Sequence, residues 1–442
     1  MKLTENQLCR LFYMLLGVAA IILGMSMALS SLTDARDSIA FVAIICLLLW
    51  VGCCVLLLQA PLFKNPNHTI AAMVLLILAL CLRVSLFDHV SGDYVSFLSV
   101  WTETMRTMTV AEALSTPIGD YNMPYLYIIL LISRLPFYDL YCIKLFSVAA
   151  DLFLALGVGK LVMKLTGKER LTLLAFAATL FCPTFWFNSG YWGQCDSIYG
   201  VFAIWALYFA VTERPKGAMA LFGLALSFKL QTIFILPILA FLLVKKYVKL
   251  TDLPIFFLTF FAASVPALLG GRSFSDTFSI YFSQMEQYPY LSLNAPSFWS
   301  LIHNDYYYEL GSAPVLLAVI GVLLMVYIFL RKYDKLDPEA ILELSLVFSL
   351  AIPWLLPKMH ERYFFLAETL SIIYAAIHPK RTPVAMILLV GGFLIYCPYL
   401  FGEMPILSLR MVAVIYGLLT LYLLSRLYGR LYEKEIFKGG SL

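Results

Sequence analysis

The sequence predicts an all-α protein, a single polytopic bundle of membrane-spanning helices that takes in residues 1–442 without a separate soluble domain. Hydrophobic residues make up 62% of the chain and charged residues only 13%, whereas soluble globular domains contain about 45–50% apolar and about 25% charged residues. Apolar runs near the length of a membrane span recur from one end of the chain to the other. No connection between them is long enough to fold as a domain of its own.

Each apolar run is expected to be a helix. A helix needs about 20 residues to cross the hydrocarbon core, and backbone groups in lipid must be hydrogen-bonded within the segment. A further run, at 217–244, is longer and is interrupted by polar residues and a proline. The uninterrupted runs lie near residues 11–31, 39–60, 69–87, 142–163, 171–187, 197–212, 252–270, 312–330, 340–356, 363–378, 382–401 and 407–427.

Basic residues collect in alternate connections along the chain: KNPNH, KLTGKER, ERPKG, KKYVK, RKYDK, HPKR and RLYGRLYEKEIFK. The positive-inside rule places such segments in the cytoplasm. All of them fall there if the N-terminus is cytoplasmic, residues 122–135 form an interfacial or re-entrant helix that does not cross, and residues 217–244 cross twice as two short helices. The expected fold is therefore a bundle of about 14 transmembrane helices with both termini cytoplasmic.

Two large outer loops follow from this orientation, at residues 88–141 and 271–311, and most of the unusual sequence lies in the outer loops. The first apolar segment is expected to remain as a helix, because its core is too long for a signal peptide and no A-x-A cleavage site follows it. Short loops and the lack of an endoplasmic-reticulum retention signal favour a bacterial plasma membrane, with the outer loops extracytoplasmic. We expect a monomer.

The sequence gives no sign of a cofactor or of nucleic-acid binding. Its nine cysteines are scattered, and they lack the C-x-x-C or Cys/His spacing of a metal site. No basic tract of the nucleic-acid-binding kind occurs. The expected partners are therefore membrane lipids and small or lipid-linked molecules, with no nucleic acid.

The first outer loop contains acids in a chain that has few. Asp93, in SGDY, follows the end of an apolar run, so its carboxylate can lie at the membrane boundary without the cost of burying a charge in hydrocarbon. Asp120 and Tyr121 follow in GDYNMPY. An isolated aspartate of this kind is more often a solvated loop acid or a helix N-cap. The other motifs in the outer loops favour a functional role for Asp93.

Aromatic and polar residues adjoin in two further outer segments. GYWGQCDS places Trp192, Gln194 and Asp196 together, and APSFW contains Trp299. Aromatic faces beside amide and carboxylate groups suit sugars, since apolar ring faces stack while hydroxyls form hydrogen bonds. The alternative is that Asp196 interacts with a helix dipole and that the tryptophan belongs to the interfacial belt.

Cations occur where a membrane protein avoids them. SFKLQ places Lys229 and Gln231 inside an apolar run, where a cation costs about 2.5–3.5 kcal/mol unless it snorkels to the interface. PKMHERYF gathers Lys358, His360, Glu361 and Arg362 at one outer helix end. Lysine, histidine and arginine that converge at headgroup depth would suit a phosphate.

SGDY, GDYNMPY, the helix IKLFSVAADLFLALG, FKLQ, APSFW and MHERYF occur in an order and spacing that resemble the GT-C glycosyltransferases. The chain looks most like the branch containing the dolichyl-phosphate-glucose-dependent glucosyltransferases and bacterial proteins related to the second mannosyltransferase of GPI-anchor synthesis. The resemblance covers roughly residues 69–378. It implies an enzyme that takes a sugar from a polyprenyl-phosphate donor on the outer side of the membrane with inversion, and it implies that Asp93 is the catalytic base.

These observations give a mechanistic hypothesis in which a hexose moves from a polyprenyl-phosphate donor to a hydroxyl of a glycan or glycolipid. Lys229, His360, Arg362 and Lys358 hold the donor phosphate. No metal is required, although Asp93 and Asp196 remain a candidate pair for a divalent cation. Two other readings are a lipid-linked glycan transporter or flippase, and a polysaccharide polymerase or ligase that uses diphosphate-linked lipids. The residues expected to contact the sugar or the acceptor are Tyr94, Asp120, Tyr121, Trp192, Gln194, Asp196, Gln231, Trp299 and Glu361.

Overall fold

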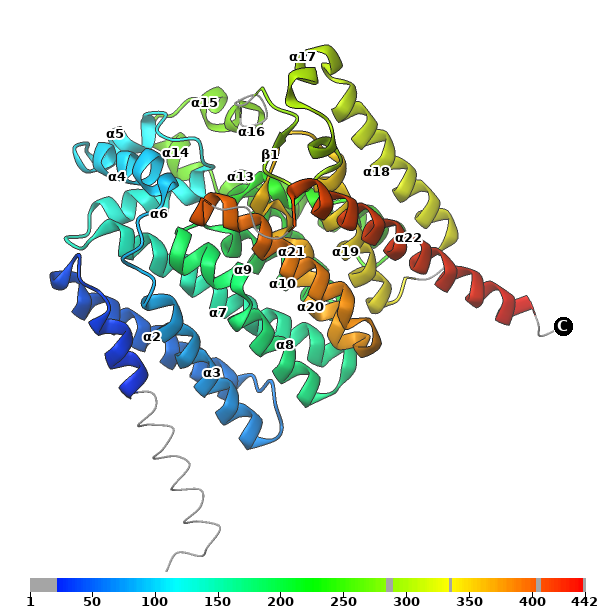
Figure 1. Ribbon diagram of the computed structural model, residues 1–442, viewed down its shortest axis with the longest axis horizontal. Coiled ribbons are helices and arrows are strands. Elements are labelled where there is room, and N and C mark those ends of the chain that lie inside the picture. The colour runs from blue at the N-terminus through cyan, green and yellow to red at the C-terminus, as the bar shows by residue number, and fades with distance from the viewer. Residues whose placement is uncertain (1–21, 284–288, 334–335, 403–406, 440–442) are drawn as a thin grey trace, which may run out of the picture.

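The computed structural model describes residues 22–283, 289–333, 336–402 and 407–439. Over these residues the chain is a bundle of helices, and its strands are the two-residue β1 (Ser292–Leu293) and β2 (Met359–His360). Short helices α4, α5, α15, α16 and α17 gather at one end of the bundle, at the top of Figure 1. An all-α membrane protein is thereby confirmed.

Seven helices in the described part of the chain are long and apolar enough to cross a membrane, and the bent pair α8 (Glu169–Phe181) and α9 (Pro183–Trp186) with the π-helical turn to Trp192 makes up to eight. α7 and α19 are the most buried of them, with 72% and 78% of the span inside the protein, whereas α18 has 17%. The seven are α2 (Ile39–Gln59), α3 (Pro66–Val84), α7 (Asp139–Thr166), α18 (Ala313–Lys332), α19 (Pro338–Leu355), α21 (Thr382–Phe401) and α22 (Leu409–Gly439).

Several apolar runs that predict full spans form shorter helices instead. The run at 252–270 is divided between α13 and α14, and the run at 363–378 begins with a 3₁₀ turn, Glu361–Phe364. Hydropathy shows how long an apolar segment of the sequence is. It does not distinguish lipid-facing helices from helices that bend or lie inside the protein. By length and composition, seven or up to eight helices of the described residues qualify as full spans, so the fourteen spans predicted are not confirmed. The shorter helices are α6 (Met123–Ser133), α10 (Asp196–Val211), α11 (Pro215–Phe228), α12 (Ile238–Val244), α13 (Leu253–Ala262), α14 (Val265–Leu269) and α20 (Phe365–Ile377).

The run at 217–244 is broken where the sequence predicts. α11 ends at Phe228, Lys229 is extended, and a 3₁₀ turn leads toward α12. α11 also packs closely on α13, because a Cβ on Gly223 would lie 2.3 Å from the Phe256 carbonyl oxygen. The break delivers Lys229 to the centre of the bundle.

The remaining short helices belong to the two large loops. In the first loop a capping box starts α5, since Thr109 and Glu112 exchange side-chain and backbone hydrogen bonds. In the second loop β1 pairs in parallel with β2, which joins this loop to the segment that contains His360. The loop helices are α4 (Ser99–Arg106), α5 (Val110–Ser115), α15 (Phe274–Phe278), α16 (Ile280–Ser283) and α17 (Tyr307–Leu310).

A buried ion pair ties three helices together below the loops. Arg83 of α3 donates from Nε to Asp151 of α7 at 2.6 Å, and both side chains are almost fully buried. The Asp151 carboxylate also accepts from the hydroxyl groups of Ser189, at 2.5 Å, and Ser197. Removing one partner of a buried ion pair costs about 3–5 kcal/mol. This network fixes residues 188–197 against the core.

A second ionic cluster lies where α19 begins, α20 ends and α22 passes. His378 Nε2 lies 3.0 Å from Glu339 and 3.1 Å from Glu343. Arg430 lies 2.7 Å from Glu343 and 3.1 Å from Asp337. The two glutamates raise the pKa of His378 above its ordinary value, although partial burial opposes this.

His378→Gln is expected to lower the thermal stability of the protein at acidic pH more than at alkaline pH. The raised pKa means that protonated His378 stabilises the fold fully below its unfolded value of about 6.5, and that this contribution disappears as the pH rises through the folded value. Melting temperatures of both proteins between pH 5.5 and 9 test this, with His303→Gln, an exposed histidine beside Asp305, as control. A gap between wild type and His378→Gln that widens with pH would contradict it.

Candidate active site

A cavity of about 500 Å³ opens where the two large loops meet the ends of the long helices. It is lined by residues from six separate parts of the chain, and the turns that follow α3, α11 and α19 contribute three of them. Four of the predicted site residues, discussed below, lie elsewhere. Those on the cavity wall are Asp93, Asp120, Tyr121, Gln194, Lys229, Gln231, Lys358, His360, Glu361 and Arg362.

Asp93 lies on one wall, in the helical turn that precedes the π-helix Tyr94–Leu98. Its Oδ2 atom accepts hydrogen bonds from the Trp192 indole, at 3.0 Å, and from the Gln194 amide, and its Oδ1 atom accepts one from the Tyr399 hydroxyl at 2.7 Å. The side chain keeps 21% of its surface exposed. The preceding turn is held by Ser91, which donates to the Trp192 carbonyl at 2.8 Å. The carboxylate is thus oriented by its donors and still open to the cavity.

Arg362 lies beside Asp93 at the cavity. Its guanidinium lies 3.9 Å from Asp93 Oδ2, 3.9 Å from Asp196 Oδ2 and 3.3 Å from Glu361 Oε1. Its Nε atom is buried and makes no hydrogen bond to a described residue. Burial opposes the charge, but the Tyr121 hydroxyl and the surrounding carboxylates outweigh it and raise the pKa of Arg362 well above its ordinary value. Arg362 is therefore a permanent cation, and its Nε–H group can donate a hydrogen bond to a ligand.

Lys229 supplies the second cation. Its ammonium lies 2.5 Å from Asp196 Oδ1, and both side chains are buried. The other oxygen of Asp196 accepts from the Asn188 amide at 2.8 Å. Asp196 is therefore a counter-ion behind the cavity wall, and the structure does not place it among the groups that a sugar or acceptor would touch. Isolated buried cations are costly, so Asp196 accounts for the presence of both Lys229 and Arg362 here.

His360 and Glu361 lie on the same wall, next to Arg362. Burial, together with the neighbouring Arg362 and Lys229 cations, lowers the pKa of His360 to about 3. Burial also raises the pKa of Glu361, while Arg362 acts in the opposite direction. The sequence hypothesis counted His360 as a cation. In the structure its imidazole is neutral at physiological pH and can offer an N–H, but no charge, to a ligand.

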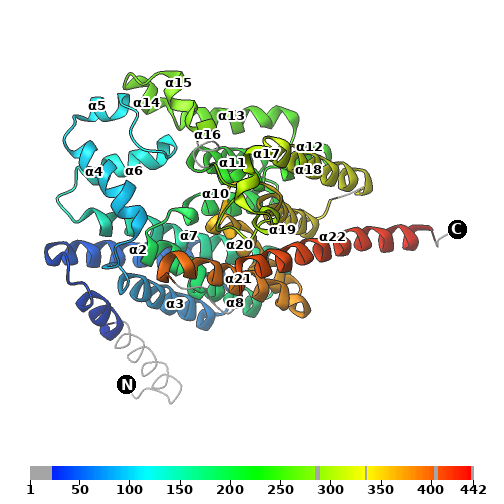
Figure 2. The same cartoon turned by 45° about the horizontal axis from the view of Figure 1, so that its top comes forward.

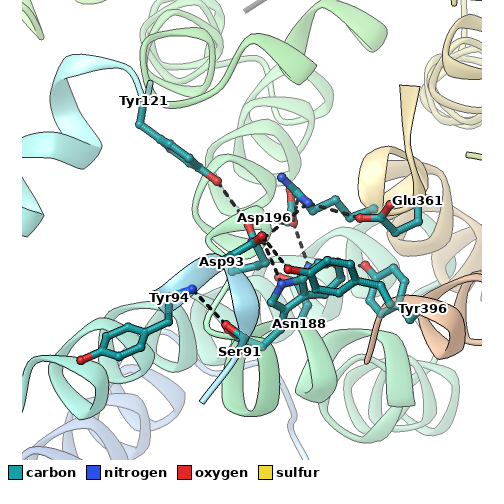
Figure 3. A network of polar contacts seen from close by, with 12 residues as sticks. Ser91, Asp93, Tyr94, Tyr121, Asn188, Asp196, Glu361 and Tyr396 are labelled. Atoms are coloured by element: carbon teal, nitrogen blue, oxygen red, sulfur yellow. Dashed lines mark hydrogen bonds and ion pairs between the residues drawn. The ribbon is translucent and has the colours of Figure 1, made fainter. Parts of the chain in front are cut away.

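Three other predicted contacts serve the fold around the cavity. The ring of Tyr94 points away from Asp93 (Figure 3), and its hydroxyl donates to Asp139 at 2.6 Å. Trp299 is buried and donates to the Leu355 carbonyl at 2.5 Å. Trp192 lies behind Asp93 and stacks on the Tyr399 ring, with centroids 4.5 Å apart. The Arg362 guanidinium lies over the indole, 5.4 Å from its centroid. Trp192 acts on Asp93 and does not line the cavity.

The carboxylates of Asp93 and Asp196, the pair left open for a divalent cation, are surrounded by hydrogen-bond donors. Asp93 faces indole, amide and phenol groups, and Asp196 faces an ammonium and an amide N–H. Hard divalent cations take oxygen ligands, and ammonium and N–H groups cannot ligate them. The donor set around these two acids fits a carboxylate held as an anion better than it fits a metal site.

Residues 121–356, more than half of the chain, match the family described as Glycosyltransferase family 87. The chain belongs to this glycosyltransferase family. Among curated proteins, none matches the sequence closely enough to count as a relative. The family 87 match includes Asp196 and Lys229, whereas Asp93, His360 and Arg362 lie outside the matched residues. The cavity is thus lined partly by residues within the family match and partly by residues from segments before and after it. Family membership sets the transporter and flippase alternative aside.

The family 87 chain also brings residues into the cavity that the sequence did not indicate. Tyr399 comes from the C-terminal end of α21, and Asn294 and Asn304 come from the second large loop. Asn304 accepts from the backbone N–H groups of Leu291 and Ser292, at 2.8 and 3.2 Å, which supports β1. A lone tyrosine in an apolar helix or an asparagine in a loop carries no signal until the fold places it beside Asp93 or β1.

Proposed function

We propose that this membrane glycosyltransferase is of the GT-C type, and that it moves a hexose with inversion from a polyprenyl-phosphate donor to a hydroxyl of a glycan or glycolipid on the non-cytoplasmic side. The observation that carries the proposal is the composition of the cavity. Asp93, a carboxylate held by hydrogen-bond donors, lines the same cavity as the cations Lys229 and Arg362. This is the arrangement needed to accept a proton from an acceptor and to stabilise a phosphate leaving group.

In the proposed reaction the acceptor hydroxyl and the leaving phosphate lie on opposite faces of the anomeric carbon. The acceptor oxygen forms a bond to that carbon while the bond to the donor phosphate oxygen breaks, and the electron pair of the broken bond stays on the phosphate. Asp93 takes the proton of the acceptor hydroxyl, a step worth about 10²–10⁴-fold in rate for a well-placed base. The lipid phosphate leaves as an anion, so no general acid is required.

The phosphate is proposed to lie between Lys229 and Arg362. In the protein without donor these cations are neutralised by Asp196, so a phosphate would share them with this acid. The Arg362 Nε–H, which bonds to no described residue, and the neutral imidazole of His360 add hydrogen bonds without adding charge. Two charges and two donors suit a phosphate oxyanion, and the proposal therefore includes no metal.

The proposed orientation has about 14 passes, some of them made by helices shorter than a full span, with the cavity outside. α10 begins at Asp196 beside the cavity, α11 ends just before Lys229, and α20 follows Arg362. The connections at the far ends of these helices are basic. They include Arg214, Lys216, Lys380 and Arg381, and the other connections expected on the same side carry Lys64, Lys168, Arg170, Lys245, Lys249, Arg331 and Lys332. The positive-inside rule then places the cavity on the non-cytoplasmic side.

Cysteine labelling tests this orientation. In a variant without the native cysteines, Asp120→Cys should react in intact cells with a maleimide that does not cross membranes, because Asp120 is exposed at the cavity. Lys168→Cys, exposed after α7, should react only after the membrane is opened. Labelling of Asp120→Cys from the cytoplasmic side alone would reverse the orientation.

The donor class separates the proposal from a polymerase or ligase that uses diphosphate-linked lipids. Purified protein in detergent should transfer a labelled hexose from a polyprenyl phosphate and should not consume a polyprenyl-diphosphate oligosaccharide. Two cations near a single phosphate site favour the monophosphate. Consumption of the diphosphate donor alone would favour the polymerase or ligase.

A further inference from the structure

The two oxygens of Asp93 lie in different surroundings. Oδ2 accepts from both Trp192 and Gln194, and Arg362 is 3.9 Å away. Oδ1 accepts one hydrogen bond in the described structure, from the Tyr399 hydroxyl at 2.7 Å. A carboxylate oxygen has two lone-pair directions, so Oδ1 retains one toward the cavity while Oδ2 is occupied.

Tyr399 is placed for this contact by packing on Trp192. Its ring stacks on Trp192, with centroids 4.5 Å apart and planes 24° from parallel, and 39% of the residue is exposed. Pro398 precedes it inside α21, and the helix ends at Phe401. The ring is therefore held by the same tryptophan that donates to the other oxygen of Asp93.

Gly92 independently indicates that the sequence favours a close approach of the Tyr399 hydroxyl to Asp93. A Cβ on Gly92 would lie 3.2 Å from the Tyr399 hydroxyl oxygen, closer than ordinary van der Waals contact. Residue 92 begins a helical turn, where alanine would otherwise be preferred over glycine by up to about 1 kcal/mol. The absent side chain leaves room for the hydroxyl beside Asp93.

We propose that Tyr399 is a positioning residue for the base: it holds Asp93 so that the open lone pair of Oδ1 faces the acceptor hydroxyl. The inference rests on the proposed role of Asp93 in sugar transfer.

Removing the hydroxyl should lower kcat by about 10- to 100-fold, because the carboxylate loses a hydrogen bond that orients it. KM for the donor should change little, since Tyr399 is not among the groups proposed to hold the phosphate.

Tyr399→Phe is the informative variant, because it keeps the stacked ring and removes only the hydroxyl. Gly92→Ala should also lower kcat, by displacing that hydroxyl. Tyr396→Phe, one turn earlier on α21, is the matched control. Its hydroxyl lies 3.4 Å from the Asn188 amide and does not contact Asp93, so its kcat should stay near that of the wild type. An unchanged kcat in folded Tyr399→Phe would overturn the inference.

A double variant separates positioning of the base from a merely structural role. The Tyr399 hydroxyl acts through the Asp93 carboxylate, so adding Tyr399→Phe to Asp93→Asn should lower the transfer rate little beyond Asp93→Asn alone. Losses that multiply in the double variant would reject the positioning role. A wild-type protein that transfers no hexose from a polyprenyl-phosphate donor would reject the proposed function, whereas an active wild type with unaffected Tyr399→Phe would reject only the role of Tyr399.

Discussion

Asp93→Asn is expected to reduce the rate of sugar transfer by at least about 10²-fold, the lower end of the contribution of a general base. Asparagine has nearly the same size as aspartate, and its amide oxygen can still accept from the Trp192 indole while its amide nitrogen donates to the Tyr399 hydroxyl oxygen, but it cannot take a proton from an acceptor at neutral pH. The variant should therefore fold. Initial rates with a labelled polyprenyl-phosphate hexose measure the loss, and donor-induced thermal stabilisation measures whether binding persists.

Asp88→Asn is the matched control, because Asp88 is the nearest competing acid. The structure ties Asp88 into a fold contact: it accepts from the Thr33 backbone at 2.7 Å, from the Thr33 hydroxyl at 2.8 Å and from Tyr141. Although burial acts in the opposite direction, these hydrogen bonds lower the pKa of Asp88. Asp88→Asn should lose stability more than transfer rate. Near-normal turnover in Asp93→Asn combined with a folded but inactive Asp88→Asn would move the base to Asp88, and unchanged transfer in both would remove the proposed mechanism.

The candidate site residues stand out in the sequence because their chemistry conflicts with their surroundings. An acid after a membrane helix, a lysine inside an apolar run and a basic cluster at an outer helix end are each costly in lipid. The costs are reduced when these groups meet, and the structure brings Asp93, Lys229 and Arg362 to one cavity. The break at Lys229 was predictable for the same reason, since polar residues in the middle of an apolar run indicate backbone that leaves the hydrocarbon.

The details that the sequence could not supply depend on three-dimensional neighbours. In the sequence His360 looks like a cation beside Arg362. In the fold, burial and the neighbouring cations Arg362 and Lys229 lower its pKa to about 3, so the imidazole is neutral. In the sequence Asp196 looks like a sugar ligand beside Trp192. In the fold its carboxylate forms an ion pair with Lys229. Tyr399 is distant in sequence from every motif and reaches Asp93 only through the path of α21. The number of full spans also could not be fixed from the sequence, because hydropathy does not show where an apolar helix bends.

Arg362→Gln is expected to weaken donor binding by about 10- to 100-fold, the range given by losing charge-assisted hydrogen bonds of about 1.5–3 kcal/mol. It should also lower the melting temperature. The buried guanidinium lies beside Asp93, Asp196 and Glu361, and its removal leaves these acids with less positive charge nearby. The burial of Arg362 among three carboxylates therefore predicts an effect on folding as well as on binding.

Arg362→Lys separates charge from geometry, because lysine keeps the positive charge and loses the planar fork that can bind a phosphate and Glu361 together. Its donor affinity should lie between those of wild type and Arg362→Gln. Lys358→Gln is the comparison at the cavity rim, where the ammonium lies over the Tyr307 ring at 4.9 Å, and it should weaken binding less. Equilibrium binding of the donor to folded protein in each variant measures the order. If folded Arg362→Gln binds the donor as tightly as wild type does, the phosphate is held by other groups, and Lys229 alone would have to carry the leaving-group charge.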